Sequence, residues 1–322
     1  MMTFFLAFVG KALALSVVCT LPHLGDIARR VAPAATVTTL ARGTDDPHVL
    51  SPTPALIARV AAADLYVENG LNLELWSERL LDSAGNPRVR PGQPGYVLAT
   101  AGVTRLEVPT DLSRAKGDLH PEGNPHAWKD PLNGIVVADN VAAGLSRVDP
   151  ANAATYAANA KAFRKLVHER LYGTDLVGYM GGDTLAKLDL AGKLESFLAS
   201  KGLASRLGGW KASGASLRGK PVVVYHAAWA YFVNRFGLRV VGYVEDRPGI
   251  PPTAAHRDEL VATMKREGAT LVEVTSYYDA RVPTLLAQSV GGRVVVTPGD
   301  VGGTPAATDY LSFIDALVKA FL

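Results

Sequence analysis

Cysteine is almost absent from this chain of 322 residues, since Cys19 is the only one. A single cysteine excludes an internal disulfide and a cluster of thiolate ligands for a metal. Any metal site in this protein must therefore use nitrogen and oxygen ligands, which histidine, aspartate and glutamate supply.

The chain also carries little net charge. Its 33 Lys and Arg residues stand against 30 Asp and Glu residues, which gives a formal charge of +3 at pH 7. Nucleic-acid binding needs basic residues gathered on one face, so we expect no nucleic-acid partner. A hydrophobic content of 48% with 20% charged residues is typical of a folded globular protein and excludes a disordered one. The length allows two domains, each with its own core.

A hydrophobic run long enough to cross a membrane is missing. The apolar start, residues 1–14 ("MMTFFLAFVGKALA"), has roughly ten uninterrupted apolar residues, whereas a bilayer needs about twenty. It ends in the small-x-small triplet Ala12, Leu13, Ala14, which is typical of a signal-peptide cleavage site. We therefore expect residues 1–14 to be a signal segment and the protein to be exported; the alternative is a cytoplasmic N-terminal strand and helix. Val18 stands before Cys19 where a lipoprotein signal needs a small residue, so the stretch "LSVVCTLP" predicts a buried strand.

Short β-rich runs alternate with helical runs in the first half of the chain. The predicted strands are "ALSVVCTL", "TVTTLA", "DLYVEN" and "GVTRLEV", and the helical runs between them are "HLGDIARRVA", "TPALIARVAAA" and "LELWSERLLDSA". Strands that alternate with helices predict a parallel sheet covered on both faces. We assign residues 15–148 to an N-terminal α/β lobe on this basis.

A long glycine-free stretch follows. The sequence "DPANAATYAANAKAFRKLVHERL" is rich in alanine and opens with an Asp-Pro helix-start signal, which predicts one linker helix over residues 149–172. Helical pieces broken by glycines continue to about residue 219, and then the strands "PVVVYH", "LRVVGYV", "TLVEVTS" and "GRVVVTP" alternate with helices again. The predicted fold class is α/β, with two parallel-sheet lobes, the second over residues 173–322, joined by one long rigid linker helix.

Candidate ligands lie where strands end, which is where open parallel sheets bind their ligands. His48 follows the strand "TVTTLA", His226 ends "PVVVYH" and Asp300 follows "GRVVVTP". His126 lies in a loop just before a helix that we expect to begin near Asp130. Three histidines and one carboxylate, two from each lobe, predict a tetrahedral nitrogen and oxygen site between the lobes.

Each of these residues has an ordinary alternative role. A lone histidine is usually solvated or hydrogen-bonded. However, His48 and His126 each follow a proline, which restricts the backbone before them, and His226 lies between an apolar strand and the aromatic residues at 229–232. Asp300 is the weakest candidate, because Gly-Asp after a strand is also common turn chemistry.

Four stretches carry a family resemblance. They are "DPHVLSPTPALIARVAAADLYVENGLNLELW", "GNPHAWKDP", "VVVYHAAWAYFVNRFGL" and "PGIPPTAAH". Together they resemble, in order and over nearly the whole chain, the ZnuA/TroA-type solute-binding proteins that deliver zinc or manganese to ABC importers. The resemblance implies a monomer in the periplasm that docks on an importer's membrane permease, with a periplasmic metallochaperone as a further partner.

The resemblance also implies the ligands. His48, His126 and His226 fall on the family's first three metal ligands, and Asp300 falls on its carboxylate. In this family histidine at the third position is associated with zinc and glutamate with manganese, which agrees with the preference of zinc for imidazole. His226 therefore favours Zn²⁺ as the transported ion, with Mn²⁺ as the alternative.

The chain departs from the family pattern in two places. The long histidine-rich loop of many zinc-binding members is replaced by the short "SRAKGDLHPEG", in which His120 is either an auxiliary residue for metal capture or a plain loop histidine. The segment from about residue 172 to 219 is longer than the family's usual link between helix and strand. It either contacts a partner or covers the second lobe.

Other polar residues have supporting roles in this prediction. A ligating histidine normally donates its second ring N–H to an oxygen acceptor, and four carboxylates near the ligand loops are candidates for this contact: Asp45, Asp46, Glu68 and Glu245. The remaining histidines, His23, His168 and His256, are expected to be structural or solvated.

A zinc hydrolase is the competing hypothesis, because three histidines with an open fourth position are also the arrangement of a catalytic zinc site. A fourth protein ligand such as Asp300 would close that position, and the sequence contains neither a His-Glu-x-x-His nor a Gly-x-Ser-x-Gly motif. We therefore expect a binding protein and not an enzyme. A surface adhesin or a zinc buffer is a third alternative.

Overall fold

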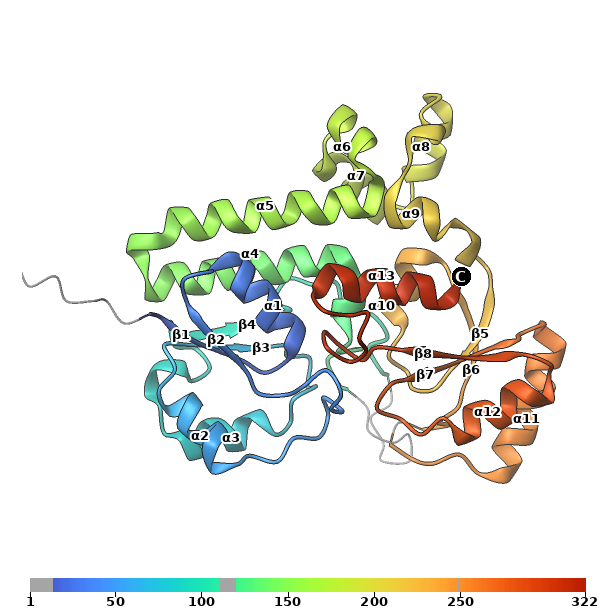
Figure 1. The fold of residues 1–322 in the computed structure, drawn as a ribbon, viewed down its shortest axis with the longest axis horizontal. Helices are drawn as coiled ribbons and strands as arrows, with labels where there is room; N and C mark the ends of the chain where they lie inside the picture. Colours follow the sequence, from blue (N-terminus) through green and yellow to red (C-terminus); the bar gives the residue numbers. More distant parts are fainter. Residues whose placement is uncertain (1–13, 111–119, 248) are drawn as a thin grey trace, which may run out of the picture.

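Two four-stranded sheets, both entirely parallel, organise the chain (Figure 1). The structure is a computed structural model that describes residues 14–110, 120–247 and 249–322. The predicted signal segment, apart from Ala14, lies outside these residues. The predicted α/β class with two parallel-sheet lobes is confirmed. In the described part of the chain, no helix is both long enough and apolar enough to cross a bilayer.

The first sheet has the strand order β2-β1-β3-β4. Its strands are β1 (Ser16–Cys19), β2 (Thr36–Thr39), β3 (Leu65–Glu68) and β4 (Tyr96–Leu98). Helices α2 (Pro54–Ala61) and α3 (Ser77–Ala84) lie on one face, and α1 (Pro22–Val31) and α4 (Pro131–Val148) lie on the other (Figure 1). Cys19 is fully buried in the central strand, as predicted.

One predicted strand of this lobe is wrong. Residues 102–108 ("GVTRLEV") form turns and loop, and β4 supplies the edge strand instead. Gly102 (φ 81°) and Glu107 (φ 51°) have left-handed backbone, which cannot continue a strand. The apolar Val103 belongs instead to a small buried cluster that also contains Ala127 and, from the second lobe, Tyr231, so the hydrophobic pattern reflects packing between the lobes and not strand pairing.

The second sheet has the order β6-β5-β7-β8, and its four predicted strands are all confirmed. They are β5 (Pro221–Val224), β6 (Arg239–Tyr243), β7 (Leu271–Thr275) and β8 (Arg293–Thr297). Helices α11 (Ala254–Glu267) and α12 (Arg281–Ser289) lie on one side, and α10 (Ala230–Phe236) and α13 (Tyr310–Phe321) lie on the other (Figure 1). The β5 valines are buried on both faces, as expected for a strand inside a parallel sheet.

A long helix connects the lobes. After a short 3-10 turn (Pro150–Asn152), α5 (Ala153–Tyr172) runs beside α4 from the first lobe to the second (Figure 1). One hydrophobic cluster includes Val17 of β1, Leu171 of α5 and Val222 of β5. Because the lobes and the helix share this core, a wide opening between the lobes would expose apolar surface, which favours small lobe movements.

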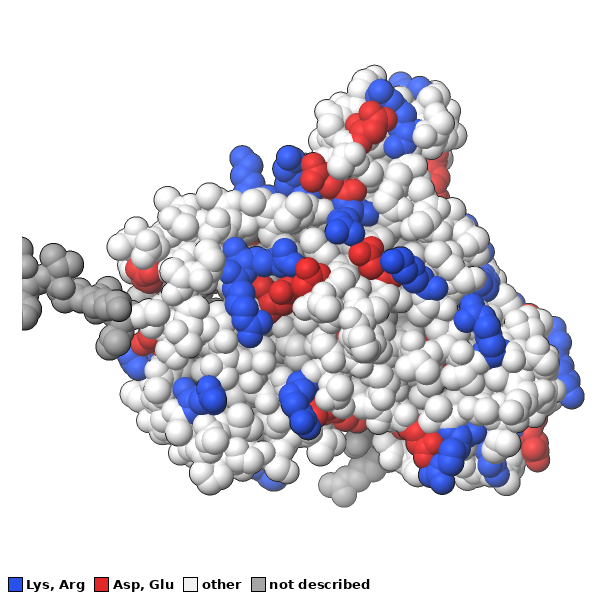
Figure 2. All heavy atoms as spheres, viewed as in Figure 1, with Lys and Arg blue, Asp and Glu red and all other residues white. Residues whose placement is uncertain are grey.

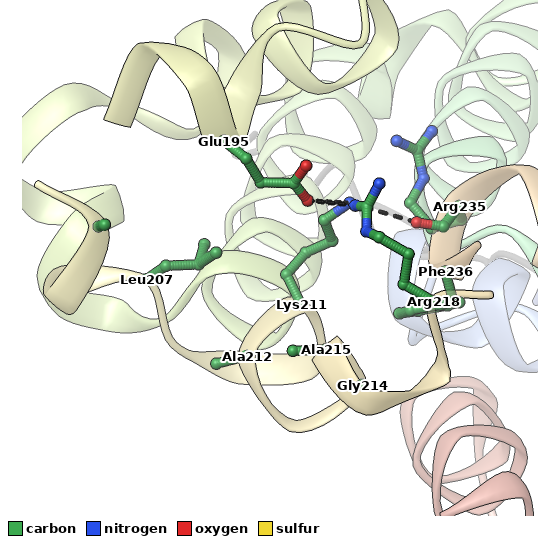
Figure 3. A pocket seen from close by; sticks show the side chains of 10 residues that line it. Glu195, Leu207, Lys211, Ala212, Gly214, Ala215, Arg218, Arg235 and Phe236 are labelled. Atoms are coloured by element: carbon green, nitrogen blue, oxygen red, sulfur yellow. Dashed lines mark hydrogen bonds and ion pairs between the residues drawn. The ribbon is translucent and has the colours of Figure 1, made fainter. Parts of the chain in front are cut away.

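The segment after α5 projects from the body of the molecule (Figures 1 and 2). It is helical, with α6 (Thr174–Met180), α7 (Gly182–Leu190), α8 (Leu194–Ser200) and α9 (Gly209–Ser213), and two 3-10 turns, Ala204–Arg206 and Ala215–Leu217. A pocket of about 430 Å³ lies at its base, lined by Glu195, Lys211, Arg218 and Arg235 among others (Figure 3). On the face shown in Figure 2, Lys and Arg side chains are interspersed with Asp and Glu, and no continuous basic surface is present there.

Candidate metal centre

The structure brings three of the predicted ligands together. One ring nitrogen from each of His48, His126 and His226 lies within 4.8 Å of the other two. His48 comes from the loop between β2 and α2, His126 stands just before the 3-10 turn Ala127–Lys129, and His226 follows β5. The three side chains therefore reach one point from both lobes, at the carboxyl ends of the strands.

Their spacing fits a metal ion bound by nitrogen. The ring centroids are 5.3 Å apart for His48 and His126, 5.3 Å for His48 and His226, and 5.4 Å for His126 and His226. A zinc-bound nitrogen lies about 2.0 Å from the ion and the ring centroid about 1.2 Å farther, so tetrahedral ligands have centroids about 5.2 Å apart. The three ring centroids are thus spaced as three imidazole ligands of one tetrahedral metal ion would space them.

Carboxylates orient two of these rings. His48 Nδ1 lies 2.7 Å from Asp46 Oδ1, and His226 Nδ1 lies 2.8 Å from Glu245 Oε2. An ionised carboxylate only accepts hydrogen bonds, so each Nδ1 donates and each Nε2 keeps the lone pair that binds metal. Asp46 and Glu245 are two of the four carboxylates considered for this role. Burial disfavours the charge of Asp46, but hydrogen bonds from His48 lower the pKa of this carboxyl below its usual value.

The other two candidate carboxylates are engaged elsewhere. Asp45 forms an ion pair with Arg42 at 2.8 Å. Glu68 accepts hydrogen bonds from Ser77 Oγ and Tyr96 Oη, both at 2.9 Å. Neither carboxylate has a described contact with a histidine of the cluster.

An amide orients the third ring. His126 Nδ1 lies 3.0 Å from Asn124 Oδ1, which also accepts the backbone N–H of His126. Burial lowers the pKa of His126 well below its usual value, and the neighbouring His48 and His226 add to this shift. His126 is therefore neutral at neutral pH, which is the form that binds metal. His48 Nε2 and His126 Nε2 are buried with no hydrogen-bond partner among the described residues, as are His23 Nε2 and His168 Nε2 outside the cluster.

Asp300, the predicted fourth ligand, makes a different set of contacts. Its Oδ2 lies 2.7 Å from His23 Nδ1, and its Oδ1 accepts the backbone N–H groups of His23 at 2.9 Å and Val301 at 2.6 Å. Asp300 is not part of the histidine cluster in the described chain. His23, expected to be structural or solvated, is fully buried and stacks on Trp128 at 4.8 Å. No sequence signal points to this contact, because 277 positions separate the two residues.

His120 lies at the edge of the cluster. Its ring centroid is 5.3 Å from that of His48 and 6.3 Å from that of His126. Its Nδ1 lies 3.0 Å from the backbone oxygen of Asn72. The loop histidine singled out in the sequence is therefore a neighbour of two proposed ligands.

With this arrangement established, comparison with known proteins identifies the family. The family model described as "Zinc-uptake complex component A periplasmic" matches residues 17–170 and 203–322. The chain belongs to this family. The unmatched residues between the two ranges contain α6, α7 and α8, so the match to the family model does not extend over the projecting helices.

Curated relatives of this family bind different metals according to their names. The chain is 34% identical over 152 residues to the iron-binding protein YfeA of Yersinia pestis, a match that covers 47% of this chain and 45% of the relative. It is 31% identical over 171 residues to the high-affinity zinc uptake system protein ZnuA of Brucella abortus, a match that covers 53% of this chain and 40% of the relative. It is 24% identical over 312 residues to the zinc-binding lipoprotein AdcA of Streptococcus pneumoniae, a match that covers 95% of this chain and 55% of the relative. The chain thus spans about half the length of the curated relatives it matches.

Two solved structures share the fold of this chain. A crystal structure of ZnuA superposes with a TM-score of 0.69 at 21% identity and covers 95% of this chain and 97% of that one. The manganese-bound periplasmic metal-binding protein of Candidatus Liberibacter asiaticus superposes with a TM-score of 0.66 at 19% identity, covering 95% and 99%. At these low sequence identities, the superpositions show that the fold is shared and nothing more.

Proposed function

We propose that this protein is an extracytoplasmic solute-binding protein that captures a transition-metal ion between its lobes and delivers it to an ABC importer. The observation that carries this proposal is the tetrahedral spacing of His48, His126 and His226, each oriented through Nδ1. Membership of the zinc-uptake component A family supports it.

Zinc is the ion that the ligands favour. The names of the relatives include iron, manganese and zinc, so the choice depends on the chemistry of this chain. Imidazole nitrogen suits zinc, whereas manganese prefers carboxylate and water oxygens. Manganese is the alternative, and it would need oxygen ligands beside the three imidazoles. Asp300 as the fourth ligand and His120 as an auxiliary capture residue remain predictions.

The role in transport follows from the architecture. The ion enters between the lobes, and the ligand loops close around it. The metal-loaded protein, a monomer in the periplasm, then docks on the importer's membrane permease. A periplasmic metallochaperone is a further partner. Because both lobes and α5 share one hydrophobic core, the lobes should move only slightly relative to each other when metal binds. Ordering of the ligand loops should then be the main structural change on metal binding.

A zinc hydrolase is less well supported than a binding protein. A hydrolytic site needs an open coordination position and a general base near the bound water. The carboxylates next to the cluster, Asp46 and Glu245, already accept hydrogen bonds from the Nδ1 atoms of His48 and His226. They are placed to orient ligands.

The test is a zinc titration against a competing chelator, after the purified protein has been stripped of metal. Wild type should bind one zinc per chain, and His226→Gln, which keeps side-chain volume but removes the imidazole, should bind it much more weakly. His168→Gln is the matched control, because His168 is also buried but lies on α5, away from the cluster. A wild type without stoichiometric zinc, or equal loss in both variants, would contradict the proposal.

A further inference from the structure

We infer that Asn124 is a positioning residue that couples the two lobes at the metal site, because its side chain contacts a histidine of the first lobe and the backbone of the second lobe at the same time. This inference rests on the proposed function and leaves its ligands unchanged. It assigns Asn124 no direct contact with the ion. Asn124 is buried, with 6% of its surface exposed, and stands two residues before His126.

The amide of Asn124 makes four hydrogen bonds. Its Oδ1 lies 3.0 Å from His126 Nδ1 and accepts the backbone N–H of His126, also at 3.0 Å. Its Nδ2 donates to Glu107 Oε2 at 2.8 Å and to the backbone oxygen of Ala227 at 2.7 Å. A side-chain amide has two acceptor and two donor positions, so these four partners account for all of them.

The partners also determine which way the amide faces. The backbone N–H of His126 can only donate, whereas the ionised Glu107 and the carbonyl of Ala227 can only accept. A flipped amide would place its oxygen against two acceptors and its NH₂ group against a donor, and such mismatches are costly in a buried position. Asn124 Oδ1 therefore faces His126, so that Nδ1 of this histidine carries the proton and Nε2 keeps the lone pair for metal.

The hydrogen bond to Ala227 crosses from the first lobe to the second. Ala227 directly follows His226, in a turn that is closed by a hydrogen bond from the backbone N–H of Ala228 to the backbone oxygen of His226 at 2.7 Å. One amide thus connects the ring of His126 with the backbone next to His226. Because the two ligand loops come from opposite lobes, neither can shift far without stretching a hydrogen bond to Asn124.

The backbone around Asn124 is fixed within the first lobe. The backbone N–H of Asn124 donates to the backbone oxygen of Leu106 at 2.8 Å. Gly123 has φ 104°, and a Cβ at this position would lie 2.8 Å from the same oxygen, so the close approach requires glycine. Glu107, the acceptor from the first lobe, has φ 51°, which is unfavourable for a residue with a side chain. Backbone strain of this kind is concentrated at functional sites.

A carboxylate in place of the amide separates two roles. Asn124→Asp still accepts from both donors of His126, but an oxygen replaces the NH₂ group. If the side chain only orients His126, the added negative charge should strengthen zinc binding, since a carboxylate makes a ligating histidine more basic. If the side chain couples the lobes, the new oxygen faces the acceptors Glu107 and Ala227 and pushes the ligand loops apart. Zinc binding should then weaken, which is the result we expect.

Two measurements on the same variants test the inference. Chelator-competition titrations at about pH 8, where histidines are neutral, should show zinc binding about tenfold or more weaker in Asn124→Asp. Asn124→Leu, which loses all four side-chain hydrogen bonds, should bind zinc about 10–100-fold more weakly. NMR of the zinc-free protein with isotope-labelled histidine distinguishes the two tautomers of His126. Nδ1 should carry the proton in wild type and in Asn124→Asp, whereas Asn124→Leu should lose this preference.

A second substitution tests the contact with Glu107 directly. In the Asn124→Asp background, Glu107→Gln supplies an amide donor for the new carboxylate and should restore part of the lost zinc affinity. Glu122→Gln is the matched control, because it removes the same charge two residues from Asn124, from a carboxylate that pairs with Arg105 at 3.2 Å. It should restore nothing. Circular dichroism melting curves establish that each variant is folded.

The outcomes separate this inference from the proposed function. Unchanged or tighter zinc binding in Asn124→Asp would overturn the inference, because the side chain would then only orient His126. Equal recovery with Glu107→Gln and Glu122→Gln would also overturn it, since charge and not the contact would explain the loss. The receptor proposal stands in both cases. A wild type that binds no zinc would instead reject the proposed function, while the tautomer measurement, made without zinc, would still show whether Asn124 positions His126.

Discussion

Arg235 of the second lobe forms a buried ion pair with Asp130 of the first, with Nη2 and Oδ2 2.8 Å apart. The same guanidinium contacts Asp189 of the projecting segment, also at 2.8 Å, and Asp189 accepts further bonds from Lys211 Nζ and Tyr172 Oη. Burial disfavours the charged form of Arg235, but Asp130 and Asp189 outweigh it and raise the pKa of the guanidinium above its usual value. One arginine thus connects both lobes and the segment that the family model does not match.

Replacing Arg235 with methionine should destabilise the fold strongly. The change leaves the buried carboxylate of Asp130 without its ion-pair partner, while Asp189 keeps Lys211. Removal of one member of a buried ion pair typically costs about 3–5 kcal/mol. Arg218→Met is the matched control, because Arg218 pairs with Glu195 on the surface and such pairs contribute about 0–1 kcal/mol. Denaturant unfolding of both variants gives the comparison, and equal stability of the two would contradict a structural role for the buried pair.

Adjacent aspartates should differ in their effect on metal binding. Asp46→Asn weakens the acceptor that orients His48, and loss of such a contact usually reduces metal affinity by about 10–100-fold. Asp45→Asn is the control, because Asp45 pairs with the exposed Arg42 and contacts no ligand. Chelator-competition titrations with zinc measure both. An equal loss of zinc affinity in the two variants would show that affinity depends on the negative charge near the site and not on the contact that orients His48.

Zinc affinity should fall as the pH drops. A histidine with an ordinary pKa of about 6.5 must lose a proton to bind metal, so protons compete with zinc below that pH. Burial lowers the pKa of His126 well below its usual value, so His126 is already neutral and releases no proton in this range. The logarithm of the dissociation constant, measured between about pH 5.5 and 7.5, should therefore change with a slope smaller than the number of histidine ligands. A pH-independent affinity would argue against histidine ligation.

The sequence predicts the framework and the histidine cluster because both depend on local patterns. The valine-rich stretch at β5 and the placement of His48 and His226 at strand ends are visible in short windows, and the parallel-sheet rule then brings the ends together. The edge strand β4 was missed because it has only three residues, while the more strand-like residues 102–108 pack between the lobes.

Contacts between distant residues were not predictable in this way. The pairs His23 with Asp300 and Arg235 with Asp130 join positions 277 and 105 apart, and neither partner has a distinctive local pattern. The position of His120 relative to the cluster likewise depends on the turn that contains Asn72. Such contacts are decided by the packing of the two lobes against each other.

Cys19 should report on unfolding of the N-terminal sheet. Burial raises the pKa of its thiol to about 12, so the reactive thiolate is essentially absent at neutral pH, and the side chain is fully covered in the central strand β1. A thiol reagent should therefore detect no cysteine in the folded protein and one per chain in denaturant.

Because zinc binds only the folded state in this proposal, added zinc should slow labelling at intermediate denaturant concentrations. His226→Gln should lose this protection while His168→Gln keeps it. Rapid labelling of the native wild type would contradict the buried position of Cys19, and protection by zinc that persists in His226→Gln would contradict the assignment of the site.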